Sequence, residues 1–398
     1  MIATLIFDDG LGRLAPLSDL RPVWAIKTGA INMIDRLLGV FDLELKSVHV
    51  QPGHEALARE QFPDLPINAA LPADEPVLCI NGRCVLPDDD FLTLEPGQSI
   101  VEEGTGHLIA AMTRGGRWTD ASVFKPRLTL PTGTLIARPW HFRGVRDACL
   151  ELDLAILHNN AQNVFPTDMA FSFGRYPLTI HPKAKIYPGV VLDREAGPIV
   201  IAEHATLRAG CTVIGPAYVG PHSTVLDRAI IKGNTSIGPW CKVAGEVGGT
   251  IFQGFANKAH DGHVGDSWVG EWANLGAGTT NSNLLNTYAE VTMRAAPDAP
   301  LERTGHQFMG AIIGDHVKTA ICTRIMTGTV LHTGAMIATS AAATGTVPPF
   351  SWCTDAGTKS FRHDKFVEIA RTVMGRRKLV PGPAYLVRLA ELHQQAGT

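Results

Sequence analysis

An aliphatic residue stands at every sixth position from Ile201 to Val243. The position four residues after each of them, as far as Cys241, holds alanine, cysteine, serine or threonine. Period six matches neither the 3.6-residue period of an α-helix nor the two-residue period of a strand. It fits short strands joined by tight corners, with one aliphatic residue on each side of a three-sided coil pointing to the axis. The pattern therefore predicts a parallel β-helix.

The same six-residue step indicates how far this β-helix extends. It begins near Ile180, and the whole repeat runs from about 178 to 350. Residues 284–307 interrupt the step, which we interpret as an excursion from one corner. Two helical stretches follow at 361–377 and 384–395, and we expect them to cap the open end, where strand edges need cover.

Before residue 175 or so, buried apolar runs alternate with helical stretches. Strands are expected at 5–7, 48–50 and 77–80, and helices at 30–38, 54–61 and 144–160. Such alternation favours a parallel sheet with helices on both faces. The chain thus divides into an α/β domain over 1–176, a β-helix over 177–352 and a C-terminal helical cap over 353–398.

Composition narrows the class of protein. The net charge is −3 without a basic block, so neither nucleic acid nor an anionic membrane is an expected partner. No apolar run approaches the ~20 residues that span a bilayer, and the N-terminus lacks the features of a signal peptide. The seven cysteines show no paired spacing, so we expect reduced thiols and a cytoplasmic location.

The densest polar chemistry lies in two stretches of the β-helix, 257–266 and 274–283. His260 falls where the six-residue phase is locally broken, so it need not point inward. Gly276 and Gly278 carry no side chain and leave room for a thin ligand. Acyl transfer from a thioester to an amine needs a base such as histidine and an N–H donor for the oxyanion. These stretches therefore suit acyl transfer.

Other interpretations of these residues remain open. His260 and His263, with nearby aspartates, could bind a metal, but side chains on short strands and corners diverge, so no metal is assigned. A single histidine is also often only a hydrogen-bonded structural residue. Asn281 and Asn283 stand at corners, where asparagine commonly serves as a turn residue.

The spacing of these residues resembles the acetyltransferase half of the bifunctional bacterial enzymes that make UDP-N-acetylglucosamine. His260 stands five residues before the Gly-Asp pair at 265–266, as the general base does in that family. Asn274 and Ala277 fall on the family's Asn-Ile-Gly-Ala-Gly stretch. The resemblance implies that His260 is the general base and that Asn283 positions the thioester or the amine.

The resemblance also assigns substrate and coenzyme A contacts, with acetyl-CoA as the acyl donor, to Lys258, His263, Asn274, Ala277 and Gly278. His263 stands where the family has tyrosine, and Lys258 is one place nearer the histidine than the family's lysine. The family's next loop carries a lysine that reaches a neighbouring subunit. Residues 284–307 contain no lysine, so only Arg294 or Arg303 could substitute.

A second motif follows the first strand. Residues 10–23, Gly-Leu-Gly-Arg-Leu-Ala-Pro-Leu-Ser-Asp-Leu-Arg-Pro-Val, resemble the signature loop of sugar-phosphate nucleotidyltransferases. Such a loop holds nucleotide phosphates with backbone N–H groups, and its arginine neutralises the pyrophosphate. The resemblance assigns nucleotide contacts to Gly10, Gly12, Arg13, Arg21 and Lys125.

Two departures bear on the chemistry of this motif. The family's lysine after proline is Val23, and the family's Mg²⁺-binding Gly-Asp corresponds to Asn81-Gly82-Arg83. Arginine cannot ligate a cation. The carboxylates at 88–90 are close in sequence, but three consecutive acids are typical of a solvated turn. Mg²⁺ is expected only together with an active N-terminal domain.

The sequence therefore predicts a nucleotidyltransferase-like α/β (Rossmann-like) domain, then a left-handed parallel β-helix and a C-terminal helical segment. We expect transfer of an acyl group from acyl-CoA to the amine of an amino-sugar phosphate or an NDP-amino sugar. We expect a homotrimer, because one flat prism face cannot enclose a substrate and three prisms close a ring. Two alternatives stay open: sugar-1-phosphate nucleotidyl transfer with the β-helix as scaffold, and an N-terminal half that only binds sugar nucleotide.

Overall fold

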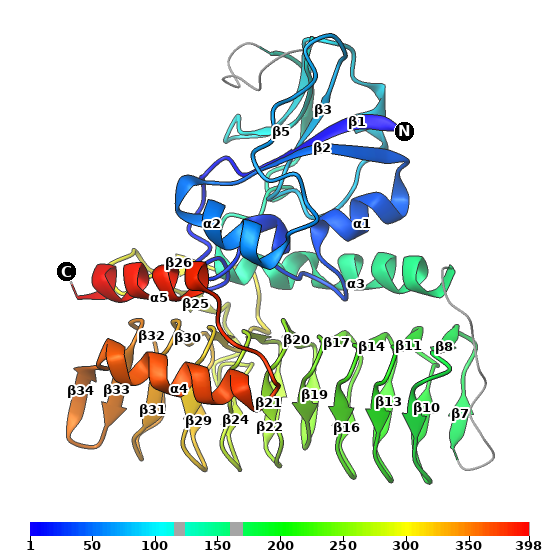
Figure 1. Cartoon of the computed structure of the whole chain (residues 1–398). Helices are drawn as coiled ribbons and strands as arrows, with labels where there is room; N and C mark the ends of the chain where they lie inside the picture. Colours follow the sequence, from blue (N-terminus) through cyan, green and yellow to red (C-terminus); the bar gives the residue numbers. More distant parts are fainter. Residues whose placement is uncertain (115–123, 160–169, 398) are drawn as a thin grey trace.

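The protein has two tiers, seen in a computed structural model that describes residues 1–114, 124–159 and 170–397 (Figure 1). An α/β domain forms the upper tier, and a β-helix forms the lower one. Between them lies the long helix α3 (Phe142–Asn159). The structure confirms the predicted order of an α/β domain, a parallel β-helix and a C-terminal helical segment.

A six-stranded sheet forms the core of the α/β domain, in the order β2-β1-β3-β5-β4-β6. Its strands are β1 (Ile2–Phe7), β2 (Leu43–His49), β3 (Leu78–Asn81), β4 (Gln98–Glu102), β5 (Leu108–Met112) and β6 (Lys125–Leu130). Its helices are α1 (Met33–Val40) and α2 (Pro52–Gln61), with short 3₁₀ turns at Val23–Ala25, Asp89–Thr93 and Pro139–His141. The three strands expected from the sequence are β1, β2 and β3.

The prediction of a wholly parallel sheet is wrong. Strand β1 pairs in parallel with β2 and β3, but β5 runs antiparallel to both β3 and β4. The cause is the short turn between β4 and β5. A parallel pair needs a crossover of a dozen or more residues, whereas a short turn joins only antiparallel strands.

Three sides of short parallel strands make up the β-helix. The nine-stranded side contains β8 (Leu178–Ile180), β11 (Ile199–Ile201), β14 (Ala217–Val219), β17 (Thr235–Ile237), β20 (Ile251–Phe252), β23 (Trp268–Val269), β27 (Ile312–Ile313), β30 (Val330–Leu331) and β32 (Thr346–Val347). The second side contains β9 (Lys185–Ile186), β12 (Thr206–Leu207), β15 (Thr224–Val225), β18 (Lys242–Val243) and β21 (Asn257–Lys258). It continues through bridges at Asn274 to β28 (Lys318–Thr319), β31 (Met336–Ala338) and β33 (Ser351–Thr354), and it ends in β34 (Gly357–Ser360), which runs antiparallel to β33.

The third side completes each coil and is built in the same way. It contains β7 (Phe171–Phe173), β10 (Val191–Asp193), β13 (Thr212–Ile214), β16 (Ile230–Ile231), β19 (Glu246–Gly248) and β22 (His263–Gly265), followed by β24 (Thr280–Asn281) and β29 (Arg324–Ile325). The residues on the six-residue step point inward: Ile201, Leu207 and Val213 are fully buried. The predicted period is therefore confirmed by the packing of the interior.

The nine-stranded side carries the α/β domain. Leu150 and Leu154 of α3 pack on Val200 and Tyr218, which point outward from this side. Asp153 of the same helix forms an ion pair of 2.7 Å with Arg36 of α1, and both side chains are completely buried. Helix α3 is thus fixed to both tiers, and the other two sides of the β-helix remain to face outward.

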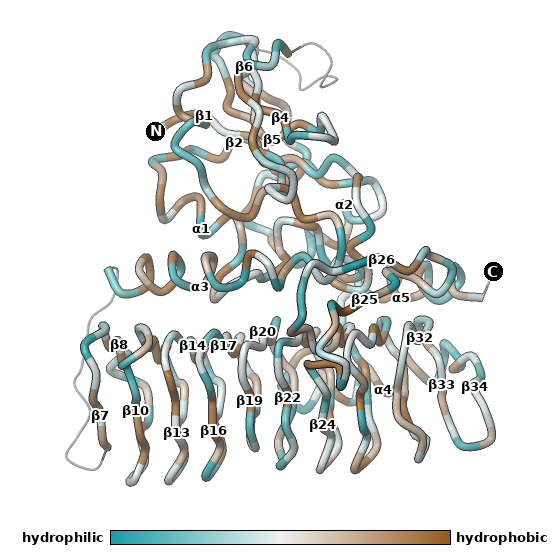
Figure 2. Tube along the Cα trace, turned by 180° about the vertical axis from the view of Figure 1, so that it is seen from behind, coloured by the Kyte–Doolittle hydropathy of each residue, from teal (hydrophilic) through white to brown (hydrophobic). Residues whose placement is uncertain are grey.

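The excursion predicted at 284–307 is confirmed, and it leaves one corner of a coil. Its neck is closed by an antiparallel bridge between Leu284 and Phe308. Within it, β25 (Thr292–Met293) pairs with β26 (Glu302–Arg303), at the level of α3 in Figures 1 and 2. Its apolar residues pack against Trp140, just before α3, and against Phe142, the first residue of α3. The excursion therefore fastens the two tiers together.

The two C-terminal helices do not cap the open end of the β-helix, so that prediction is wrong. Helix α4 (His363–Gly375) runs along one corner, and α5 (Pro383–Ala396) returns to pack against α2. The reason is an apolar row at that corner: Phe366, Ala370 and Met374 of α4 share a buried cluster with Trp272 and Phe350. None of the helices in the described ranges is long and apolar enough to cross a membrane.

Candidate active site

His260 lies at the corner between the second and third sides of the β-helix. It follows β21 and is exposed to solvent. This corner is opposite the nine-stranded side, which α3 and the α/β domain cover. The imidazole therefore stands on the free edge of the prism. The expected break in the six-residue phase is not found at this corner, because Phe252, Lys258 and Val264 keep the step and are all buried.

Lys258 takes the inward position of the same coil, and its side chain is only 1% exposed. Its ammonium group donates hydrogen bonds to the backbone oxygens of His260 and Asp261. Burial lowers the pKa of Lys258 to about 8. The predicted contact of Lys258 with substrate is therefore wrong, because the amine is turned into the prism. Instead it holds the corner that presents His260.

Ala277 and Gly278 occupy the same corner one coil further on, beside His260. Gly278 has φ of +72°, and a Cβ atom there would lie 3.2 Å from the sulfur of Cys322 in the following coil. Gly262 has φ of +109°, and a Cβ there would lie 2.2 Å from the backbone oxygen of Thr279. No side chain fits at Gly262, and only a strained one at Gly278. Backbone atoms therefore line this part of the corner, and the imidazole of His260 is exposed beside them.

The remaining predicted residues of the β-helix site lie elsewhere. His263 is on the third side, where its Nδ1 is 3.3 Å from Oε1 of Glu246. Asn274 is exposed on the second side and lines a separate pocket with Lys318. The structure therefore brings His260, Ala277 and Gly278 together, but not these two.

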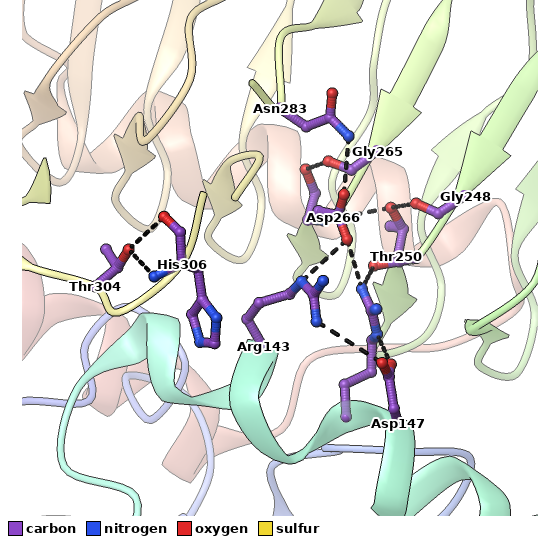
Figure 3. Close-up of polar contacts among 12 residues, drawn as sticks. Arg143, Asp147, Gly248, Thr250, Gly265, Asp266, Asn283, Thr304 and His306 are labelled. Carbon is purple, nitrogen blue, oxygen red and sulfur yellow. Dashed lines mark hydrogen bonds and ion pairs between the residues drawn. The ribbon is translucent and has the colours of Figure 1, made fainter. Parts of the chain in front are cut away.

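Asn283 belongs to a polar cluster at another corner, between the third and nine-stranded sides (Figure 3). Its amide donates to Oδ2 of Asp266 at 2.8 Å. Oδ1 of Asp266 forms ion pairs with Arg143 at 3.1 Å and with Arg146 at 2.9 Å, both from α3. Asn283 thus supports the attachment of α3 to the β-helix and does not face the corner of His260.

His306 in the excursion also approaches this cluster, which we name the α3 cluster (Arg143, Arg146, Asp266, Asn283 and His306). Burial, together with the two guanidinium groups, lowers the pKa of His306. Nothing in the sequence marks these residues as neighbours. The only local signal is a pair of arginines three residues apart on one helix, which places both on one face.

In the α/β domain, the glycine motif forms an exposed turn after β1. Gly10 and Gly12 have φ of +67° and +91°. The N–H of Gly10 donates to Oδ1 of Asp8 at 2.9 Å, and the N–H of Arg13 donates to the oxygen of Ala137 at 2.9 Å. The side chain of Arg13 is exposed. Gly10, Gly12 and Arg13 are therefore placed together at the end of the first strand, as predicted.

Beside this turn, Arg83 satisfies the carboxylate that a metal would need. Its guanidinium is 2.6 Å from Oδ2 of Asp9, and Asn81 donates to the same oxygen at 2.8 Å. Burial raises the pKa of Asp8. Across the described ranges, no three His, Cys, Asp or Glu side chains are grouped to hold a metal ion. These residues do not fit Mg²⁺.

The predicted nucleotide contact of Arg21 is wrong, and that of Lys125 stays a prediction. Arg21 is only 3% exposed, and its guanidinium forms an ion pair of 2.7 Å with Asp315 of the β-helix. It also donates to the backbone oxygen of Leu17, so it joins the two tiers. Lys125 lies on the edge strand β6, which β3, β5 and β4 separate from β1 and its glycine turn.

Comparison with known proteins bears on this domain directly. Residues 4–162 match the sugar nucleotidyl transferase family. The resemblance to sugar nucleotidyltransferases is confirmed.

A bifunctional sugar-1-phosphate nucleotidylyltransferase/acetyltransferase of Sulfurisphaera tokodaii is 29% identical over 147 residues, 35% of each chain. The bifunctional protein GlmU of Methanococcus vannielii is 30% identical over 125 residues, 31% of this chain and 27% of its own. The matches thus span about a third or less of these relatives.

Solved structures also show some similarity. The acetyltransferase domain of PglB from Neisseria gonorrhoeae is 14% identical, with 46% of this chain and 58% of that one covered at a TM-score of 0.17. LpxA of Bacteroides fragilis, a UDP-N-acetylglucosamine acyltransferase, is 13% identical, with 57% and 96% covered at a TM-score of 0.24.

Proposed function

We propose that the chain is a transferase of sugar-nucleotide biosynthesis. In this proposal it moves an acyl group, such as acetyl, from acyl-CoA to the amine of an amino-sugar phosphate or an NDP-amino sugar. The observation that carries it is the exposed imidazole of His260, presented at a glycine-lined corner of the β-helix. The names of the relatives, which pair nucleotidyl transfer with acetyl transfer, support the same reaction class.

In the proposed reaction, the amine nitrogen attacks the carbonyl carbon of the thioester. His260 takes the proton that the nitrogen loses, a task for which an imidazole is suited near neutral pH. A C–N bond forms, the C–S bond breaks, and the coenzyme leaves as a thiolate that is then protonated. Lys258 acts as a positioning residue, because its ammonium fixes the backbone of the corner from inside.

A convex corner has no opposite wall, so a complete site needs a second surface. We propose that a neighbouring copy of the chain supplies it within a homotrimer, in which three prisms close around one axis. The second and third sides meet at His260 and are the sides that α3 leaves uncovered. Multi-angle light scattering should give a mass of three chains.

We further propose that the α/β domain binds a sugar nucleotide without transferring a nucleotidyl group. The glycine turn with Arg13 is open to a phosphate, whereas Asp9 is already neutralised by Arg83. We therefore expect the protein to bind an NDP-sugar and to release no pyrophosphate from NTP and sugar 1-phosphate. Release that depends on Mg²⁺ would contradict this part of the proposal.

The central test is release of free thiol from acetyl-CoA across a panel of amino-sugar phosphates and NDP-amino sugars. Substituting His260→Ala should lower kcat by about 10²–10⁴-fold, the usual contribution of a general base. His263→Ala is the matched control, since that ring lies on the third side against Glu246, and its rate should stay near that of the parent. An unchanged rate in His260→Ala, with the assembly intact, would refute the assignment.

A further inference from the structure

A ladder of aromatic rings runs along the corner between the nine-stranded and second sides. Successive coils place a ring at the same left-handed position: His204, His222, Trp240, Phe255, Trp272 and His316. His204 and His222 stack with centroids 4.8 Å apart, and His222 and Trp240 stack at 4.3 Å with planes 11° apart. Phe255 and Trp272 stack at 4.4 Å.

Helix α4 covers only one half of this aromatic ladder. Trp272 and His316 lie beneath it and are 4% and 1% exposed. The other half is open, and Trp240 is 38% exposed. The helix ends at Gly375, and the three residues that follow, 376–378, face the open rings. Three cationic side chains therefore lie at the boundary between the covered and the open rings.

A pocket of about 380 Å³ lies at this boundary. On the β-helix it is lined by Trp240, together with His222 and Lys242. Its wall is the Arg376-Arg377-Lys378 run. Lys242, Arg376 and Lys378 form no ion pair or side-chain hydrogen bond with another part of the chain that the structure describes. The pocket thus combines an exposed indole with uncompensated positive charge.

A second pocket of about 220 Å³ adjoins the first and shares Arg376 and Arg377. It contains Lys318, whose buried Nζ finds no hydrogen-bond partner within the described ranges. Burial lowers the pKa of Lys318 to about 8. Arg377 donates to Oδ1 of Asn257 at 3.0 Å and lies between the two spaces. An anion in these pockets would satisfy an ammonium group that is otherwise left unpaired.

We propose that these joined pockets bind a phosphorylated nucleoside, with the base stacked on Trp240 and the phosphates held by Lys242, Arg376 and Lys378. Base stacking on an aromatic side chain contributes substantially and tolerates any base, while lysine and arginine form charge-assisted hydrogen bonds to phosphate. A space of this size suits one nucleotide rather than a nucleic-acid strand.

Coenzyme A is the source of this nucleotide that the geometry favours, and this point rests on the proposed function. Strand β21 and the two residues after it lead along the second side from Asn257, which lines the smaller pocket, to His260 at the far corner. Three residues of strand span about 10 Å. A flexible arm attached to a nucleotide in the pocket would therefore run along the second side toward His260. A sugar nucleotide carries the same chemistry without such an arm.

Calorimetric titration with coenzyme A and, separately, with UDP-N-acetylglucosamine tests the site. Trp240→Ala and the double substitution Arg376→Gln/Lys378→Gln should each weaken binding of coenzyme A at least about tenfold. Trp240→Phe keeps an aromatic face and should bind nearly as the parent does. Trp352→Ala is the matched control, because that indole is 45% exposed on β33, away from the pocket.

The outcomes separate this site from the proposed reaction. His260→Ala should lose turnover and keep its affinity for coenzyme A. The titrations therefore test the binding site even if the protein acetylates none of the acceptors. Substitutions that weaken only the binding of the sugar nucleotide would support a nucleotide site and exclude coenzyme A as its occupant. Unchanged affinity for both ligands in Trp240→Ala and in the double variant would overturn the proposal. Variants that change the oligomeric mass but bind both ligands with the affinity of the parent would also overturn the proposal.

Discussion

His260 of the β-helix and two arginines of the α/β domain have opposite environments. In the β-helix, the histidine singled out by the sequence is exposed at a free corner, and a buried lysine supports it from inside. In the α/β domain, two arginines in or beside the glycine motif form ion pairs with carboxylates of the protein itself. Arg21 pairs with Asp315, and Arg83 pairs with Asp9.

The difference shows that a motif residue is available to a ligand only if no internal partner claims it. In the turn of Gly10, Gly12 and Arg13, the side chain of Arg13 is exposed and has no partner among the described residues that would keep a ligand away. Arg21, the next arginine of the motif, instead joins the two tiers through its ion pair with Asp315. We therefore expect substitutions in the α/β domain to act on stability, and those at the free corner of the β-helix to act on turnover.

The largest expected effect on stability is at the joint. Arg21→Met leaves Asp315 buried without its partner and should lower the free energy of unfolding by about 3–5 kcal/mol, measured by urea denaturation. Arg21→Met/Asp315→Leu removes both charges and should regain much of that loss. A stable Arg21→Met protein that no longer binds NDP-sugar would return this arginine to a ligand-binding role.

The next effect depends on pH and concerns Lys258. Its pKa is about 8 in the folded protein, below the ordinary value of 10.5, so the unfolded chain binds more protons between these pH values. The parent should therefore become more stable as pH rises from 8 to 10.5, by at most about 3 kcal/mol from this residue. Lys258→Met should lack that gain.

Urea denaturation at pH 7.5 and pH 10 measures this difference between the parent and Lys258→Met. Lys242→Met is the matched control, because Lys242 is exposed on the same side of the β-helix. The control should follow the parent at both pH values. Equal pH dependence in Lys258→Met and the parent would show that the buried ammonium does not titrate as described.

A smaller loss is expected at the glycine turn. Arg83→Met leaves Asp9 half-satisfied by Asn81 and should cost about 1–3 kcal/mol of stability. Arg13→Met, on the exposed part of the same turn, should change stability by less than about 0.5 kcal/mol. Thermal denaturation compares them. If Arg83→Met were neutral and Arg13→Met severe, the roles of the two arginines would be reversed.

The smallest effect is expected at Asn283. Asn283→Ala removes one hydrogen bond to Asp266, which keeps both arginines of the α3 cluster, so about 1 kcal/mol of stability should be lost. The rate of thiol release should stay within about threefold of the parent. A loss as large as that of His260→Ala would instead establish the catalytic role that the sequence suggested for this asparagine.

The repeat could be predicted from the sequence because its signal is local. Each coil depends on residues six positions apart, and a step of six from Phe252 reaches Lys258 and Val264, which are both buried inside the prism. That count already places Lys258 inward. The joint could not be predicted, because Arg21 and Asp315 are 294 positions apart and belong to different motifs. The antiparallel strand β5 was missed because burial alone does not give strand direction.

The excursion between Asn281 and Ile312 illustrates how a coiled chain accommodates extra length. Trp268 pairs directly with Ile312, so the next coil of the β-helix forms in register despite the intervening loop. The loop closes on itself at its neck and adheres to the upper tier. A protein in which a short corner replaces this loop would keep the register of its β-helix strands, but it would lose a contact between the two tiers. The loop can therefore change in sequence or length without altering the strand pairing below it.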